Sequence, residues 1–332
     1  MKILVTGGLG FIGSHLVDLL ISENYEVVIL DNKISNVIGV DERCEVWIQP
    51  IKKMDFSYYH RQVSSSPFDV IFHLASVVGP AGILGHGDIS TSIINNTAKL
   101  IDYCAINQSL FVDISTSEIY SHAGKLSEDS DKICSGKYHF RTEYGVAKLL
   151  AEIMIVNRSK ITSALKYHII RPFNVAGPRQ FPDGGFVLPR FIIAKLTDQP
   201  ITIFGDGSQV RAFTDVRDIC DAIIKIAFSE YKNEIWNVGN PANKMSIKEL
   251  AIKVAENENK VSYIDPTKLH GPLFAEAKDK IPYIEKIENL LNWKPKITIE
   301  ETLLDTMNFW KKKINDGYSF DVCRGKNLDQ LI

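Results

Sequence analysis

Three glycines near the start of the chain constrain its fold more than any other feature. The stretch TGGLGFIG, residues 6–13, places Gly7, Gly10 and Gly13 directly after the apolar run KILV and directly before GSHLVDLLISE, which has helical spacing. Glycine lets a backbone turn sharply at the end of a buried strand and enter a helix whose first N–H groups stay accessible. This order of strand, glycine turn and helix predicts the first unit of a doubly wound α/β sheet.

The rest of the chain divides into two regions of different character. Short apolar runs and amphipathic segments alternate up to about residue 176, which predicts right-handed crossovers and a Rossmann-type parallel sheet with helices on both faces. After that point, a Gly/Pro loop is followed by shorter elements that predict a smaller C-terminal α/β cap. We expect residues 1–176, with strand segments returning from about 210–240, to form the first domain. We expect about 177–209 and 241–320 to form the cap, with a cleft between them.

A carboxylate at the end of the second predicted strand indicates which ligand the glycine turn binds. Asp31 follows the turn by about 20 residues, where a carboxylate accepts hydrogen bonds from the ribose hydroxyls of an adenosine. The same carboxylate would repel a 2′-phosphate, so the sequence favours NAD over NADP. The alternative, a glycine turn of purely structural use, does not account for the complete strand, turn, helix and second strand.

Composition excludes several other classes of protein. The 332 residues carry a net charge of −2, and Lys and Arg are scattered, so no nucleic-acid partner is expected. Five cysteines without a C-x-x-C pair favour reduced thiols, and no metal site is expected. The N-terminus resembles neither a secretory leader nor a membrane span, so we expect a cytoplasmic protein without a membrane partner.

A tyrosine and a lysine four residues apart are the candidate catalytic pair. Tyr144 and Lys148 fall on a predicted helix at residues 144–156 and therefore on one face of it. An ammonium group beside a phenol, together with a positive nicotinamide ring, lowers the pKa of the tyrosine towards neutrality and makes it usable as a base. Such a pair alone is usually a surface pair, but the glycine turn and the hydroxyl cluster at residues 115–117 favour catalysis.

Many further motifs occur along the chain in the order in which they occur in one protein family. They are HLAS (73–76), STSEIYS (115–121), YGVAK (144–148), RPFNVAGPR (171–179), IFGDGSQVRAFTDVRD (203–218), WNVGN (236–240) and LLNWKPK (290–296). With the glycine turn, they make the chain similar, from residue 1 to about 312, to the extended short-chain dehydrogenase/reductase family. In particular, the chain resembles its NAD-dependent sugar-nucleotide epimerase/dehydratase branch.

The resemblance implies a reaction and a set of site residues. Tyr144 would remove the proton of a sugar hydroxyl, usually at C4, while hydride passes from that carbon to NAD. Thr116 would hydrogen-bond the same oxygen, and Lys148 would also hold the nicotinamide ribose. The implied catalytic residues are Thr116, Ser117, Glu118, Tyr144 and Lys148. The implied cofactor-binding residues are Gly7, Gly10, Phe11, Ile12, Gly13, Asp31, Asn32, Leu74, Ala75, Ser76, Ser115, Tyr144, Lys148 and Pro172. The implied contacts of a nucleotide-diphosphate sugar are Asn174, Arg179, Val187, Phe204, Arg211 and Lys280.

Two of the positions that depart from the family pattern carry a positive charge. Lys280 replaces the usual arginine of an Arg-x-Pro-Asp motif and would be a second phosphate-binding cation. Arg217 lies where family members often have an acidic residue, and a surface salt bridge is as good an interpretation as a substrate contact.

The triplet Thr116-Ser117-Glu118 bears on the fate of the keto sugar after the first oxidation. A 4,6-dehydratase needs an acid where this chain has Ser117, and a hydroxyl is a poor proton donor, so dehydration is disfavoured. We lead with epimerisation at C4 or release of the keto sugar, which need only Tyr144, Lys148 and Thr116. Decarboxylation of a uronate is second, because Thr-Ser-Glu resembles that group's triplet. It would need cations near the carboxylate, for which Arg211, Arg217 or Arg179 are candidates.

Two further expectations concern assembly and the class of protein. In the family, the helices that correspond to residues 90–107 and 144–156 meet their copies in a four-helix bundle, which implies a homodimer. A non-catalytic NAD-binding regulatory protein is the alternative of a different class. The intact pair of Tyr144 and Lys148 argues against it.

Overall fold

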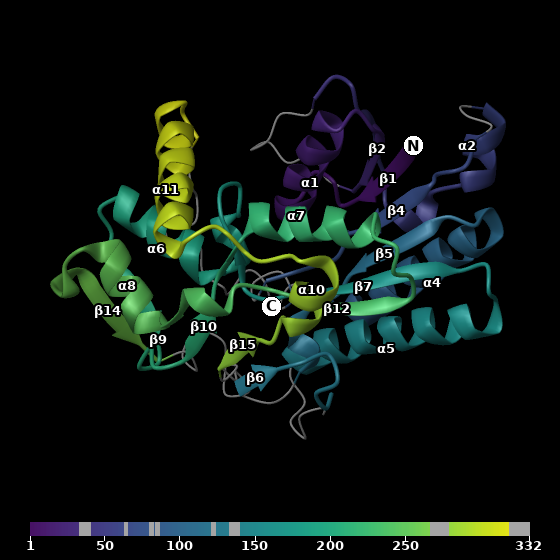
Figure 1. Ribbon diagram of the computed structural model, residues 1–332. Coiled ribbons are helices and arrows are strands. Elements are labelled where there is room, and N and C mark those ends of the chain that lie inside the picture. The colour runs from purple at the N-terminus through teal and green to yellow at the C-terminus, as the bar shows by residue number, and fades with distance from the viewer. Residues whose placement is uncertain are drawn as a thin grey trace.

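The computed structural model describes residues 1–32, 41–62, 66–79, 83, 87–120, 124–132, 140–265 and 279–318. In these residues the largest element is a parallel sheet of seven strands in the order β12-β7-β5-β4-β1-β2-β3 (Figure 1). The chain is therefore a Rossmann-type α/β protein, as the glycine turn and the alternation predict. The strands are β1 (Lys2–Thr6), β2 (Glu26–Asp31), β3 (Glu45–Ile48), β4 (Val70–His73), β5 (Leu110–Ile114), β7 (Lys166–Pro172) and β12 (Glu234–Val238).

Helices cover both faces of this sheet. One face packs against α1 (Phe11–Ser22), α7 (Val216–Ala227) and α10 (Glu285–Leu291) through a core that includes Trp236 and Trp293. The other face packs against α2 (Phe56–Gln62), α4 (Ile89–Asn107) and α5 (Phe140–Ile161) (Figure 1). Because all the strands run in parallel, their carboxyl ends gather at one edge, where the motifs of the sequence analysis lie.

The smaller region has a core of its own. Helices α6 (Val187–Leu196), α8 (Ile247–Ala255) and α11 (Ile299–Asn315) pack together with Phe213 and Trp310. Two strands, β9 (Ile201–Phe204) and β14 (Val261–Ile264), form a parallel pair beside them. Within residues 210–240, β12 pairs with β7 at the edge of the large sheet.

Short strands connect the two regions. A second sheet has the order β13-β10-β15-β6, with strands β6 (Gly124–Leu126), β10 (Val210–Ala212), β13 (Lys244–Ser246) and β15 (Lys280–Pro282). The strands β8 (Val175–Ala176) and β11 (Thr214–Asp215) form a further parallel pair. The sequence did not predict the four-stranded sheet, since three-residue strands carry no periodic signal.

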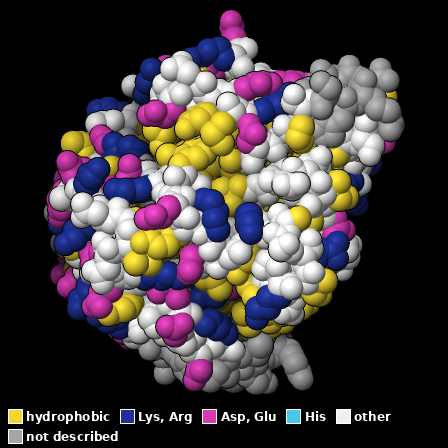
Figure 2. Space-filling model, turned by 45° about the vertical axis from the view of Figure 1, so that its right-hand side comes forward, with side chains coloured by type: hydrophobic (Ala, Val, Ile, Leu, Met, Phe, Trp, Pro, Cys, Tyr) yellow, Lys and Arg dark blue, Asp and Glu magenta, His cyan; other side chains and the backbone are white. Residues whose placement is uncertain are grey.

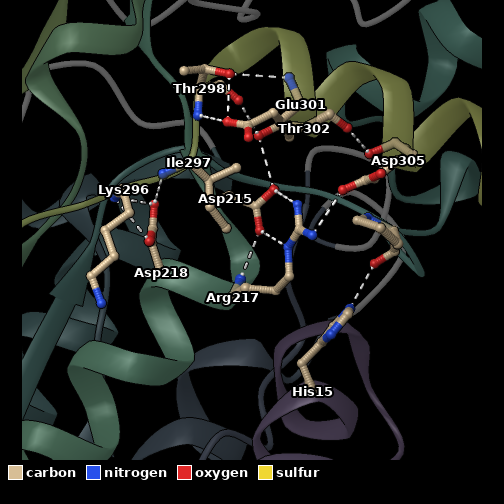
Figure 3. Close-up of polar contacts among 12 residues, drawn as sticks. His15, Asp215, Arg217, Asp218, Lys296, Ile297, Thr298, Glu301, Thr302 and Asp305 are labelled. Carbon is tan, nitrogen blue, oxygen red and sulfur yellow. Dashed lines mark hydrogen bonds and ion pairs between the residues drawn. The ribbon is translucent and has the colours of Figure 1, made fainter.

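Polar contacts at the start of α7 join the smaller region to the large sheet (Figure 3). The buried carboxylate of Asp215 accepts hydrogen bonds from Arg217, at 2.8 and 2.9 Å, and from Thr302 of α11 at 2.9 Å. Arg217 also pairs with Asp305 of α11 at 2.8 Å, and Asp218 accepts the backbone N–H groups of Lys296 and Ile297. Arg217 is therefore a salt-bridge residue between α7 and α11, the first of the two interpretations given above.

The surface and the helices add two findings. On the face drawn in Figure 2, Lys and Arg alternate with Asp and Glu, so the described residues of that face present no continuous basic field. Of the helices in the described ranges, none has the length and apolar character needed to cross a membrane.

Candidate active site

The glycine turn forms a close-fitting backbone cradle at the end of β1. Gly7 has a φ of +74°, and a Cβ there would lie 2.7 Å from the backbone nitrogen of Ala75. A Cβ on Gly13 would lie 2.1 Å from the carbonyl oxygen of Gly7. Because Gly10 occupies the N-cap of α1 without a side chain, the first N–H groups of the helix, from Phe11 to Gly13, remain available to an anion.

Asp31 lies beside this turn at the carboxyl end of β2. One of its carboxylate oxygens accepts the N–H of Leu9 at 3.0 Å, which fixes the side chain against the glycine turn. Asn32 follows directly, and Leu74, Ala75 and Ser76 follow β4, which pairs with β1 on the side away from β2. A helix N-terminus for a pyrophosphate and a carboxylate for a ribose are thus present at one edge, and the residues fit a dinucleotide such as NAD.

The candidate catalytic pair lies in the first part of α5, against the end of β5. Lys148 is buried, and its Nζ donates a hydrogen bond to the carbonyl oxygen of Ile114 at 2.8 Å. Burial raises the pKa of Tyr144, while hydrogen bonds with Thr116 and Ser76 lower it. The structure therefore brings Tyr144, Thr116 and Ser76 into contact, and additional positive charge is needed to make the phenol a base near neutral pH.

A second glycine explains why α5 can come so close to the serine-rich turn. A Cβ on Gly145 would lie 3.0 Å from the carbonyl oxygen of Glu118, tighter than most real contacts. Thr116 caps this turn, since its Oγ1 accepts the N–H of Glu118 at 3.1 Å. Glycine at position 145 thus allows Tyr144 and the triplet 116–118 to share one site.

Glu118 lies in a cluster of cations. Its carboxylate pairs with Lys280 of β15 at 3.0 Å and with Arg141 of α5 at 3.4 Å, and Arg211 pairs in register with Lys280. Burial favours the protonated form of Glu118, but Arg141, Lys280 and Arg211 outweigh it and lower its pKa to about 2. Lys280 also donates to the carbonyl oxygen of Ser117 at 3.1 Å. Three basic side chains thus gather around one carboxylate.

A buried hydrogen-bond network supports the site from behind. Ser115 Oγ donates to Glu152 of α5 at 2.5 Å, and the guanidinium of Arg171 on β7 binds the same carboxylate in a fork, at 3.0 and 2.6 Å. A bidentate pair of this kind fixes orientation as well as charge. It locks α5 to the ends of β5 and β7, and so fixes the relative position of Tyr144 and Thr116.

The remaining predicted residues lie around this centre. Pro172 ends β7, and Asn174 follows it with a φ of +38° and donates to the carbonyl oxygen of Ala212 at 3.3 Å. Val187 begins α6, and Phe204 ends β9 with the guanidinium of Arg190 stacked 4.0 Å from its ring centre. Arg179 pairs with Asp18 of α1 at 2.6 Å and not with the Glu118 cluster. Their contacts with a substrate stay predictions.

Sequence reasoning assigned no role to three charged residues of the site, Arg141, Glu152 and Arg171. Arg141 carried a usable signal, because it lies three residues before Tyr144 and so on the same side of the helix. The pairing of Arg171 with Glu152 carried no signal in the sequence, because only the packing of α5 on β7 brings the two side chains together.

Comparison with known proteins supports the resemblance. The model of the NAD dependent epimerase/dehydratase family matches residues 3–239. The UDP-N-acetyl-alpha-D-glucosaminuronate decarboxylase of Bacillus cytotoxicus is 29% identical over 324 residues, covering 95% of this chain and 99% of that protein. The structure of UDP-glucuronic acid 4-epimerase from Bacillus cereus, in complex with UDP-glucuronic acid and NAD, has a TM-score of 0.79 at 29% identity, over 94% of this chain and 99% of that one. Pal from Bacillus thuringiensis has a TM-score of 0.81 at 28% identity, with coverages of 94% and 99%.

Proposed function

Because the chain belongs to the NAD dependent epimerase/dehydratase family, we propose that it oxidises C4 of a UDP-activated hexuronate and then decarboxylates the resulting keto acid. The family is NAD dependent, so NAD is the cofactor. The choice of a uronate agrees with two of the relatives, whose names specify a glucosaminuronate and a glucuronic acid. In this proposal the Rossmann-type domain, residues 1–176 with returning strands, holds NAD, and the cap holds the nucleotide.

The cation cluster around Glu118 is the observation that carries the choice of substrate. Glu118 follows Thr116 by two residues, and Thr116 contacts Tyr144, so the cluster adjoins the place where the reacting hydroxyl must lie. Lys280 is buried, and a buried ammonium needs negative charge around it. The gathering of Lys280, Arg141 and Arg211 at this place supports a subsite for the carboxylate of the sugar.

In this proposal Tyr144 is the base of the first half-reaction. The phenolate accepts the proton of the C4 hydroxyl, and Thr116 orients that hydroxyl by a hydrogen bond. Bound NAD supplies the acceptor for the hydride that leaves C4. Lys148, held at the end of β5 by Ile114, contributes the positive charge that favours the phenolate. The resulting ketone lies β to the C6 carboxylate.

The second half-reaction then needs no base. The C5–C6 bond breaks, carbon dioxide leaves, and the electron pair passes to the C4 oxygen, where Tyr144 and Thr116 hydrogen-bond the enolate. A proton from solvent completes C5. The hydride would then return to C4 while Tyr144 gives its proton back to the C4 oxygen, so that the product differs from the substrate by carbon dioxide alone. Glu118 does not take part as an acid or as an effective base, because a carboxyl with a pKa of about 2 is ionised at neutral pH and binds protons weakly. For the same reason, dehydration and epimerisation at C3 or C5 are disfavoured.

Epimerisation at C4 is the second candidate. It requires only Tyr144, Thr116 and Lys148, all of which meet at the site, and the Bacillus cereus relative is named for it. Both candidates share the first half-reaction and the uronate, and they differ in whether the keto acid loses its carboxylate before hydride returns.

The test compares UDP-glucuronate with UDP-glucose, which differ at C6, on the NAD-loaded enzyme. We expect UDP-glucuronate to lose one carbon dioxide by mass spectrometry, and UDP-glucose to react much more slowly. An unchanged mass with an inverted C4 by NMR would favour the epimerase. Equal reaction of the two sugars would contradict the assignment of the cluster to a carboxylate.

The homodimer expected from the family is a further part of the proposal. Val146, Leu150 and Ile153 of α5 are spaced by four and three residues and are 39%, 41% and 47% exposed. An apolar stripe of this spacing on a helix suits packing against a second helix. Since α4 lies beside α5, the two helices of each protomer would form the four-helix bundle.

A further inference from the structure

Two side chains of α1 hold the loop that follows β8. His15 points from the helix towards this loop, and its Nε2 donates a hydrogen bond to the carbonyl oxygen of Pro178 at 2.9 Å (Figure 3). The carboxylate of Asp18 pairs with the guanidinium of Arg179 at 2.6 Å. His15 and Asp18 are three residues apart and so lie on one side of the helix. The proposed reaction gives neither residue a role.

The loop, residues 177–180, has a backbone conformation that needs such support. Arg179 has a φ of +70°, in the left-handed region that residues other than glycine rarely adopt. A conformation of this kind persists only where surrounding contacts fix it, and such residues cluster at ligand sites. On its other side the loop is held by Gln180, which is buried and donates from Nε2 to the carbonyl oxygen of Val175 at 2.9 Å. The loop is therefore fixed between α1 and β8.

The same loop continues from the part of the site that the sequence predicts for the diphosphate. Asn174 lies directly before β8, also has a positive φ of +38°, and donates to the carbonyl oxygen of Ala212 at 3.3 Å. Ala212 is the residue after Arg211, and β8 pairs with β11, which begins two residues further on. A shift of the loop would therefore move β8 and Asn174 relative to Arg211.

We propose that His15 and Asp18 are positioning residues of the substrate site: by holding residues 177–180, they fix β8 and Asn174 where Asn174 binds the nucleotide sugar. The inference rests on the proposed function, because it needs a nucleotide-diphosphate sugar as the substrate. The first N–H groups of α1 face the place of the NAD pyrophosphate, so one helix positions the cofactor with its amino end and the substrate loop about one turn further along.

A purely structural role of these contacts predicts a different result. Loss of packing would lower the stability of the protein and weaken NAD binding, kcat and substrate binding together. Loss of positioning acts on substrate binding alone, because Tyr144 and Thr116 are held by α5 and β5 and do not depend on the loop. The KM for the sugar, compared with kcat and with NAD binding, therefore separates the two roles.

The test uses His15→Leu, which removes the donor, and His15→Gln, whose amide supplies a donor in its place. We expect His15→Leu to raise the KM for UDP-glucuronate roughly fivefold, with kcat and the NAD retained through purification near their wild-type values. His15→Gln should restore most of the KM. Asp18→Ala, at a half-exposed position, should raise the KM roughly twofold. Glu23→Ala, exposed at the C-cap of the same helix, is the matched control and should change none of these quantities.

A titration with UDP by calorimetry measures the same effect without a reaction, and UDP should bind more weakly to His15→Leu and to Asp18→Ala. An unchanged KM and unchanged UDP binding in both variants would overturn the inference, and so would a parallel loss of kcat and NAD or a His15→Gln protein no better than His15→Leu. Should His15→Leu fail to fold, the UDP titration of Asp18→Ala decides. If the wild type binds UDP but leaves UDP-glucuronate unchanged, the proposed function fails, and the UDP titration still tests His15 and Asp18.

Discussion

Replacing Lys280 by methionine tests, through its pH dependence, the ion pair between this buried lysine and the partly exposed Glu118. The pKa of Glu118 falls from 4.5 to about 2 in the folded protein. At about 1.4 kcal/mol per pKa unit, this is about 3 kcal/mol of stability at neutral pH. Arg141 supplies part of it and remains in the variant, and the variant no longer buries an ammonium, so we expect a loss of about 1–2 kcal/mol.

The sign follows from the lowered pKa. A carboxylate whose pKa is lower in the folded state stabilises that state above the pKa of the unfolded chain, and the effect disappears as pH falls through the folded value. The difference between wild type and Lys280→Met should therefore shrink as the pH falls from 4.5 towards 2.

Urea unfolding at neutral pH and in acid measures this difference. Lys244→Met, on strand β13 of the same sheet with an exposed side chain, is the matched control and should cost little at either pH. A loss in Lys280→Met that is the same at both pH values would refute the reasoning, since it would come from packing and not from charge. No loss at neutral pH would also refute it.

Three other variants test the base, the cofactor cradle and the dimer. Tyr144→Phe should lower the rate of sugar-dependent NAD reduction by roughly 100- to 10,000-fold with unchanged binding of NAD, measured by stopped-flow absorbance; a rate near that of the wild type would remove the tyrosine from the mechanism. Gly13→Ala should weaken NAD binding at least about tenfold, because the new Cβ would lie 2.1 Å from the carbonyl oxygen of Gly7. The amount of NAD that stays bound through purification measures this loss, and full retention of NAD would contradict the prediction. Leu150→Glu should convert the dimer to a monomer in light scattering, whereas a stable dimer of this variant would place the interface elsewhere.

The sequence predicted those features that depend on local patterns. The glycine turn, Asp31 and the pair of Tyr144 and Lys148 are each defined by spacing along one element, and the structure places them at one edge of the sheet. The partners of the charges were not predictable in this way. Lys280 was expected at a phosphate, but it contacts Glu118, which lies far earlier in the chain, because β15 pairs with β6 and β10.

The same reason explains why the sequence could not rank the three candidate arginines. Arg211, Arg217 and Arg179 were equal candidates for a carboxylate subsite in the sequence. The structure separates them, because Arg217 and Arg179 pair with acidic residues of α11 and α1, and only Arg211 lies beside Lys280. Which cation meets which anion is decided by strand register and helix packing, and neither is encoded in a short motif.

The most direct test of the central claim is the mass of the product formed from UDP-glucuronate by the NAD-loaded protein. We predict a nucleotide sugar that is lighter by one carbon dioxide, and none when Tyr144 is replaced by phenylalanine. Recovery of UDP-glucuronate without loss of its carboxylate and without any reduction of NAD would contradict this claim.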